Sequence, residues 1–241
     1  MNKRTDKSQI NRTLDTLLSS RSRIRVSSNI LSITQTYFDA LCDLKKAAHN
    51  RGGRWADQKY ILEKLLTACE MAICGYVLDD KSDINTAKWF VQHVMDGVSY
   101  YTGNKKLRKN YHFKPQNAMK YAETLKNLVE REKIDLTIFI APSGIMPAAA
   151  LMYYTKKYPI GIKYARLPKV DKNIFFPQNM YITEFKELIK NKKVLIVDGV
   201  LENTEVAAAA IKFIVAFRPK QLYLSTEGPT IKKVLRLERE Y

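Results

Sequence analysis

Apolar residues recur at steps of three and four through the first part of the chain, which is the spacing of one buried face on an α-helix. Two such faces lie within residues 30–44 and 61–76, and a third helix is predicted over residues 83–98. This part contains no convincing strand pattern. We therefore predict a helical N-terminal domain over residues 1–110.

The pattern changes in the second part of the chain, where short and continuously apolar runs predict strands at residues 136–140, 160–165, 194–197 and 221–225. Helices are predicted at residues 115–129, 145–154, 183–189 and 205–217. Apolar strands separated by helices are typical of a parallel sheet that is covered on both faces. The prediction for residues 111–241 is therefore an α/β domain with a doubly wound, mostly parallel sheet.

Ligands of such sheets bind beyond the carboxyl ends of the strands, so the turns after two predicted strands are candidate sites. After the first strand, residues 141–144 (Ala-Pro-Ser-Gly) form a small-residue loop that lets backbone amides approach an anion. Asp198 closes the strand at 194–197, before a polar loop and a helix. Its carboxylate can accept hydrogen bonds from sugar hydroxyls, while the helix start favours phosphate. A simple turn residue or helix cap explains Asp198 equally well.

The strand at 160–165 is followed by two cations, Arg166 and Lys169, which are placed to meet a diphosphate. For Arg166 alone, a solvated charge at the end of a strand is as good an explanation.

In this order, the segments resemble those of type I phosphoribosyltransferases over roughly residues 116–226. The resemblance implies that the loop with Pro142, Ser143 and Gly144 binds pyrophosphate, and that the amides of Ser143 and Gly144 hold it. It implies that Asp198 is catalytic, because it binds ribose hydroxyls and steadies the charge of an oxocarbenium-like transition state. Mg²⁺ is then expected only together with phosphoribosyl diphosphate, and the protein alone is expected to hold no metal.

The resemblance also implies a flexible hood over residues 167–181. Phe175, Phe176 and Tyr181 in this segment are candidates for stacking on a base. Ordinary packing of a long loop is the alternative for all three.

The chain departs from the family where the family's phosphate loop has a second acid and a Thr/Gly-rich run. Gly199 stands in place of the acid, and Glu202 and Glu205 bring two carboxylates that repel a phosphate. We therefore expect that phosphoribosyl diphosphate is not turned over in the ordinary way. The candidate ligand-binding residues are Pro142, Ser143, Gly144, Arg166, Lys169, Asp198, Gly199, Glu202, Asn203 and Thr204.

The formal net charge is +17, with +8 in the first 110 residues and +9 in the rest. A basic surface of this charge is suited to bind RNA, DNA or phosphorylated small molecules. The alternative is a solvated basic surface without a specific role. Two basic segments fit nucleic acid, although a solvated edge and an anchored linker explain them too. They contain Arg21, Arg23 and Arg25, and Lys105, Lys106, Arg108 and Lys109 followed by Tyr111, His112 and Phe113.

Three cysteines (Cys42, Cys69 and Cys74) on helical patterns argue against a disulfide framework, and no apolar run suggests a membrane span or a secretory signal. The expected location is the cytoplasm.

Two functions remain open. The first is a non-catalytic regulator or partner subunit that senses a nucleotide-like or phosphorylated sugar ligand and binds a second copy, another protein or nucleic acid. The second is an active glycosyl- or phosphoribosyltransferase, or an enzyme that cleaves N-glycosidic bonds.

Overall fold

The computed structural model describes residues 15–16, 18–43, 54–102, 114–164, 174–177, 180–199, 204–226 and 235–237, with only the backbone given for 204, 226 and 235–237. The chain divides into two compact units, Met1–Met119 and Lys120–Tyr241. This division falls within the helix α7 (Pro115–Glu132). The domain boundary expected after residue 110 lies outside the described residues and stays a prediction.

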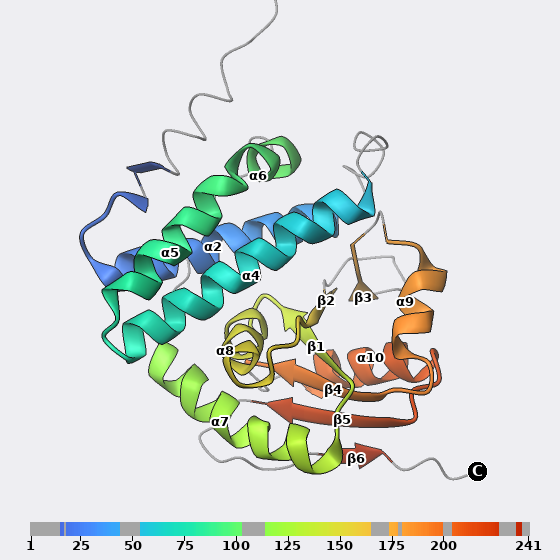
Figure 1. The fold of residues 1–241 in the computed structure, drawn as a ribbon. Helices are drawn as coiled ribbons and strands as arrows, with labels where there is room; N and C mark the ends of the chain where they lie inside the picture. Colours follow the sequence, from blue (N-terminus) through green and yellow to red (C-terminus); the bar gives the residue numbers. More distant parts are fainter. Residues whose placement is uncertain are drawn as a thin grey trace, which may run out of the picture. The chain divides into compact units, whose positions relative to one another are not determined.

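The first unit is helical, as predicted, and its described helices are α2 (Arg23–Leu41), α4 (Trp55–Val77), α5 (Lys81–His93) and α6 (Met95–Thr102) (Figure 1). α4 packs against both α2 and α5. The face of α2 that contains Ile30, Ile33 and Tyr37 is fully buried. Inside this core the Tyr37 hydroxyl donates to the carbonyl of Gln58 at 3.2 Å. This hydrogen bond satisfies the Tyr37 hydroxyl within the apolar core.

The helix predicted over residues 83–98 is in fact two helices, α5 and α6, separated at Val94. The Val94 amide donates to Val91 across a tight turn at 3.2 Å. Val94, Met95 and Val98 are all buried, so the break lets the chain change direction while both helices keep their apolar residues in the core.

The second unit contains a six-stranded sheet in the order β3-β2-β1-β4-β5-β6. Its strands are β1 (Leu136–Ala141), β2 (Ile160–Tyr164), β3 (Ile174–Phe175), β4 (Lys193–Asp198), β5 (Gln221–Thr226) and β6 (Leu235–Leu237). β2, β1, β4 and β5 are parallel, and β3 and β6 pair with their neighbours as antiparallel edges. The predicted mostly parallel sheet is confirmed, with two short edge strands that the sequence pattern did not indicate.

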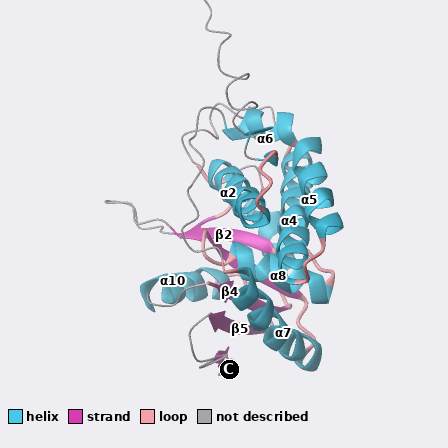
Figure 2. Cartoon of the chain, turned by 90° about the vertical axis from the view of Figure 1, so that its left-hand side faces the viewer, coloured by secondary structure: helices cyan, strands magenta, loops and turns pink. Residues whose placement is uncertain are grey.

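The helices of this unit are α7, α8 (Ile145–Thr155), α9 (Ile182–Ile189) and α10 (Thr204–Val215). α7 and α8 lie on one side of the sheet and α10 on the other (Figures 1 and 2). α9 packs against α10, because Phe185 lies 5.8 Å from Phe213 and 5.4 Å from Phe217 between ring centroids. With helices on both faces, β4 is buried from Val194 to Val197, as its apolar sequence predicts.

The chain leaves β1 toward β2 on one side and later returns to place β4 on the other side. The topological switch point therefore lies between β1 and β4, at their carboxyl ends. In open α/β sheets, this is where a crevice for a ligand forms. No helix in the described part of the chain is long and apolar enough to cross a membrane.

Candidate functional site

The two predicted turns meet at the switch point. β1 and β4 are adjacent, with Phe139 opposite Val197, so the turn at residues 142–144 and Asp198 follow neighbouring strands. Asp198 is 2% exposed, and its Oδ1 accepts a hydrogen bond from the Ser143 hydroxyl. The expectation that Asp198 and this loop end adjacent central strands is confirmed.

Two glycines allow this close approach of the two turns. A Cβ atom on Gly199 would overlap the carbonyl group of Ser143, and one on Gly144 would lie 2.5 Å from the Val197 carbonyl oxygen. Real Cβ atoms do not come this close to backbone. Position 199 therefore has no room for any side chain in this conformation, which gives a packing reason for the missing second acid.

The turn after β1 closes on itself through the backbone. The Gly144 amide donates to the Ile140 carbonyl at 2.8 Å, and the Ile145 amide lies 3.4 Å from the Pro142 carbonyl oxygen. The turn itself uses the Gly144 N–H group in this structure, and the role of Gly144 toward diphosphate stays a prediction. The described residues offer no acceptor to the Ser143 amide, so this N–H is available to an anion.

A hydrogen bond between two further elements bridges the carboxyl end of β1. Tyr164, the last residue of β2, donates from its hydroxyl to Oε1 of Glu205 at 2.6 Å. Because β1 lies between β2 and β4, a contact from β2 to the helix that follows β4 must span the end of β1. Glu205 is exposed in the first turn of α10, so its charge lies where the helix start otherwise favours phosphate.

Sequence reasoning missed Tyr164. The available signal was its position, because it is the next-to-last residue of the strand predicted at 160–165, two residues before Arg166, and carries a hydroxyl on a long side chain.

Several predicted ligand residues cannot be placed. Arg166, Lys169, Glu202 and Asn203 lie outside the described residues, and for Thr204 only the backbone is described. Their roles remain predictions.

The three candidates for base stacking are in different surroundings. Phe175 is buried in β3, and Phe176 stacks on Phe185 with ring centroids 5.0 Å apart and planes at 20°. Ordinary packing accounts for these two rings. Tyr181, just before α9, is 77% exposed, so it remains available to a ligand.

The described residues contain no group of three or more His, Cys, Asp or Glu side chains that could hold a metal ion. Asp198 is a single carboxylate beside the turn at residues 142–144. Mg²⁺ commonly uses one or two carboxylates together with phosphate oxygens of a bound ligand. The residues present are therefore compatible with Mg²⁺ that arrives on a diphosphate.

No protein-family model matches the chain, and no curated protein sequence matches it. Solved structures resemble it in fold. Purine phosphoribosyltransferase from Pyrococcus horikoshii is 19% identical with a TM-score of 0.39, over 47% of this chain and 74% of that one. A hypothetical protein from Neisseria gonorrhoeae with bound ppGpp is 16% identical with a TM-score of 0.39, over 48% and 68%. A hypoxanthine-guanine phosphoribosyltransferase from Bacillus anthracis is 17% identical with a TM-score of 0.38, over 55% and 81%. The chain is thus similar to phosphoribosyltransferases at low identity, and the inferences below depend on its own strand order and site geometry.

Proposed function

We propose that the chain binds a nucleotide or another phosphoribosyl-type ligand at the carboxyl ends of β1 and β4, and that it acts as a regulator or partner subunit without ordinary phosphoribosyl transfer. The buried Asp198 carboxylate, held by Ser143 at the switch point, is the observation on which the proposal depends. An ionised carboxylate accepts hydrogen bonds at several lone-pair positions, and ribose hydroxyls are suitable donors. The free Ser143 amide would then face a phosphate.

Three features argue against ordinary transfer. The Ser143 hydroxyl already occupies one oxygen of Asp198. Position 199 has no space for a second acid. Tyr164 fixes the Glu205 carboxylate at the start of α10, where it repels a ligand phosphate. Together they favour a site that binds a ligand weakly and reports its presence to a second copy of the chain or another protein.

An active glycosyl- or phosphoribosyltransferase is the second candidate, because Asp198 keeps the position of a catalytic acid at the end of β4. In that case Asp198 would hold the ribose hydroxyls and stabilise positive charge as the bond to diphosphate breaks. Mg²⁺ would neutralise the departing diphosphate.

Calorimetry with phosphoribosyl diphosphate and Mg²⁺, and with nucleoside monophosphates, tests the binding site. We expect Asp198→Asn to weaken binding at least about ten-fold, since it removes a charge-assisted acceptor. The matched control is Asp135→Asn, because Asp135 accepts from the Lys193 amide at the amino ends of the same strands. Equal binding by wild type and Asp198→Asn would reject the site.

A diphosphate-release assay with a panel of bases separates the two candidate functions. If the chain is a regulator, the wild type should release no more diphosphate than the Asp198→Asn variant. Release that depends on Asp198 would establish the enzyme instead.

A further inference from the structure

We infer that the helical unit carries a separate site for single-stranded nucleic acid, with a backbone phosphate in a basic cavity beside α5 and a base on the exposed ring of Trp89. The inference concerns the first compact unit alone and does not depend on the Asp198 site.

A cavity of about 160 Å³ lies between the start of α2 and one side of α5. Val26 and Ile84 form its apolar floor and are almost fully buried. Its walls are polar and mostly cationic, and are formed by Ser20, Arg21, Arg23, Lys81, Asn85 and Lys88. Such a volume holds a phosphate group together with a few water molecules.

The charges around this cavity are poorly balanced. Arg23 forms an ion pair with Asp79, but no described acidic side chain forms one with Arg21, Lys81 or Lys88. No acidic residue lines the cavity. The nearby Asp80 carboxylate is engaged as the cap of α5, where it accepts from the Ser82 and Asp83 amides. Three cations around one cavity repel each other, and an anion between them removes that repulsion.

The exposed ring of Trp89 lies on α5 next to the residues that line the cavity, and further rings extend from it around the helix. Trp89 is 55% exposed, and the His93 ring stacks on it at 5.1 Å with an angle of 14°. Phe90 lies beside Trp89 at 5.2 Å, and the Lys64 ammonium is 5.1 Å from the Phe90 ring centre. We call Lys64, Trp89, Phe90 and His93 the Trp89 patch. A base has a flat face that extends such a stack whatever its identity.

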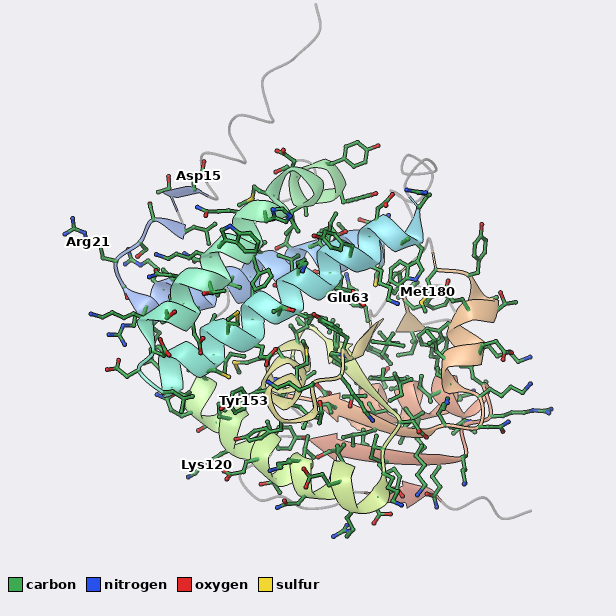
Figure 3. All side chains as sticks on the ribbon, viewed as in Figure 1. Asp15, Arg21, Glu63, Lys120, Tyr153 and Met180 are labelled. Carbon is green, nitrogen blue, oxygen red and sulfur yellow. The ribbon has the colours of Figure 1, made fainter. Side chains whose placement is uncertain are left out.

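The helix period places Trp89 next to the cavity, whereas His93 and Phe90 lie farther around α5. At about 100° per residue, Lys81, Asn85, Lys88 and Trp89 fall within an arc of about 100° around α5. Lys81 and Trp89 are about 12 Å apart along the helix axis. Arg21 extends outward from the chain just before α2 (Figure 3), so it can reach a strand that leaves the cavity.

The cavity and the aromatic rings together indicate which ligand binds here. A phosphate alone fits the cavity but leaves the aromatic rings unused, and a duplex hides the faces of its bases. A groove of positive charge beside stacking rings is the arrangement by which proteins hold single strands of DNA or RNA. The positive balance of the first 110 residues favours the approach of such a strand.

Fluorescence anisotropy with a labelled twelve-nucleotide oligo(dT), the matching oligo(U) and a duplex of equal length tests the inference in the full chain. The variant Arg21→Gln/Lys81→Gln/Lys88→Gln should bind single strands at least ten-fold more weakly at low salt. The slope of log affinity against log salt should fall by about 2, since each phosphate contact on a single strand contributes about 0.7. Trp89→Ala should weaken binding about ten-fold and leave the slope unchanged, and Trp89→Phe should keep most of the affinity.

The matched control removes three charges from the other unit. Lys186, Lys190 and Lys192 are exposed, so Lys186→Gln/Lys190→Gln/Lys192→Gln changes the net charge equally. It should alter affinity less than three-fold, and all variants should keep the melting temperature of the wild type. Equal loss in the two triple variants, no binding at low salt, no effect of Trp89→Ala, or tighter binding of the duplex would each overturn the inference. Asp198→Asn should leave binding unchanged, which separates this site from the one at β4.

Discussion

Tyr164 and Glu205 are 41 residues apart in the chain, and they share a 2.6 Å hydrogen bond above the carboxyl end of β1. The bond fixes a carboxylate beside the proposed phosphate position, at the helix start that otherwise attracts anions. A charge held in place by a neighbour repels a ligand more effectively than one on a freely moving side chain.

Removing this charge should strengthen ligand binding. Glu205→Gln keeps a hydrogen-bond acceptor for Tyr164 but deletes the like charge, which for a partly exposed pair is worth about 1 kcal/mol, or about five-fold in affinity. Calorimetry with phosphoribosyl diphosphate measures this gain. Glu187→Gln, on the exposed surface of α9, is the control and should change nothing. Replacing both Glu202 and Glu205 by Thr should add a second gain of similar size, and unchanged affinity in the double variant would refute the repulsion.

The tight packing at Gly199 gives a stability prediction. Gly199→Ala places a methyl group against the Ser143 carbonyl, so backbone must shift, and we expect a loss of about 1–3 kcal/mol in the free energy of unfolding. Gly97→Ala is a matched control, because its methyl group meets only the end of the flexible Ile61 side chain. Urea unfolding should show the larger loss for Gly199→Ala. Equal losses in the two variants would contradict the packing at the two turns.

A buried thiol makes the helical unit sensitive to alkaline pH. Burial raises the pKa of Cys69 from 9.0 to about 12. The hydrogen bond with Thr34 lowers the pKa by a smaller amount. The folded pKa is above the unfolded one, so the stabilisation is complete below about pH 9 and is lost as pH rises toward 12. In that window the free energy of unfolding should fall by roughly 1.4 kcal/mol per pH unit from this group.

The comparison with Cys69→Ala isolates this effect. Unfolding in urea with reductant at pH 7.5, 9.5 and 10.5 should show a shallower loss in the variant than in wild type. Parallel pH profiles would show that the thiol does not titrate on unfolding. In the folded wild type at pH 8 the Cys69 thiol should also react slowly with iodoacetamide, because it is buried and protonated.

A buried hydrogen bond joins α7 to β5. The Tyr121 hydroxyl donates to Ser225 Oγ at 2.7 Å, and both residues are buried. Tyr121→Phe should lower the free energy of unfolding by about 1–2 kcal/mol, because it leaves a buried hydroxyl without this donor. A double-mutant cycle with Ser225→Ala should give a coupling of about 1 kcal/mol. A coupling near zero would show that the bond contributes nothing.

The sequence predicts β1 and β4, and the closeness of the turns that follow them, because both depend on strong hydrophobic patterns. β1 and β4 are continuously apolar since both faces of the sheet are covered. Parallel strands then bring their carboxyl ends to one edge, which places Asp198 near Ser143. β3 and β6 are too short for any pattern, and they exist because an edge of the sheet offers backbone partners to them.

The finer features of the site could not be obtained in this way. The contact of Tyr164 with Glu205 depends on the reach of one side chain over β1. The lack of room at Gly199 depends on how closely two backbones approach. From the sequence alone, Gly199 is a missing acid, whereas the structure gives the steric reason for the glycine.

The pairing of β1 with β4 also determines when the site can form during folding. Leu136 pairs with Val194, which lies 58 residues later in the chain. β1, α8 and β2 all come before β4. A growing or refolding chain therefore has an open edge on β1 until β4 arrives, and this long loop closure slows the step. Ser143 and Asp198 meet only when β4 is in place, so a ligand at this site binds molecules with a completed sheet and stabilises them against unfolding.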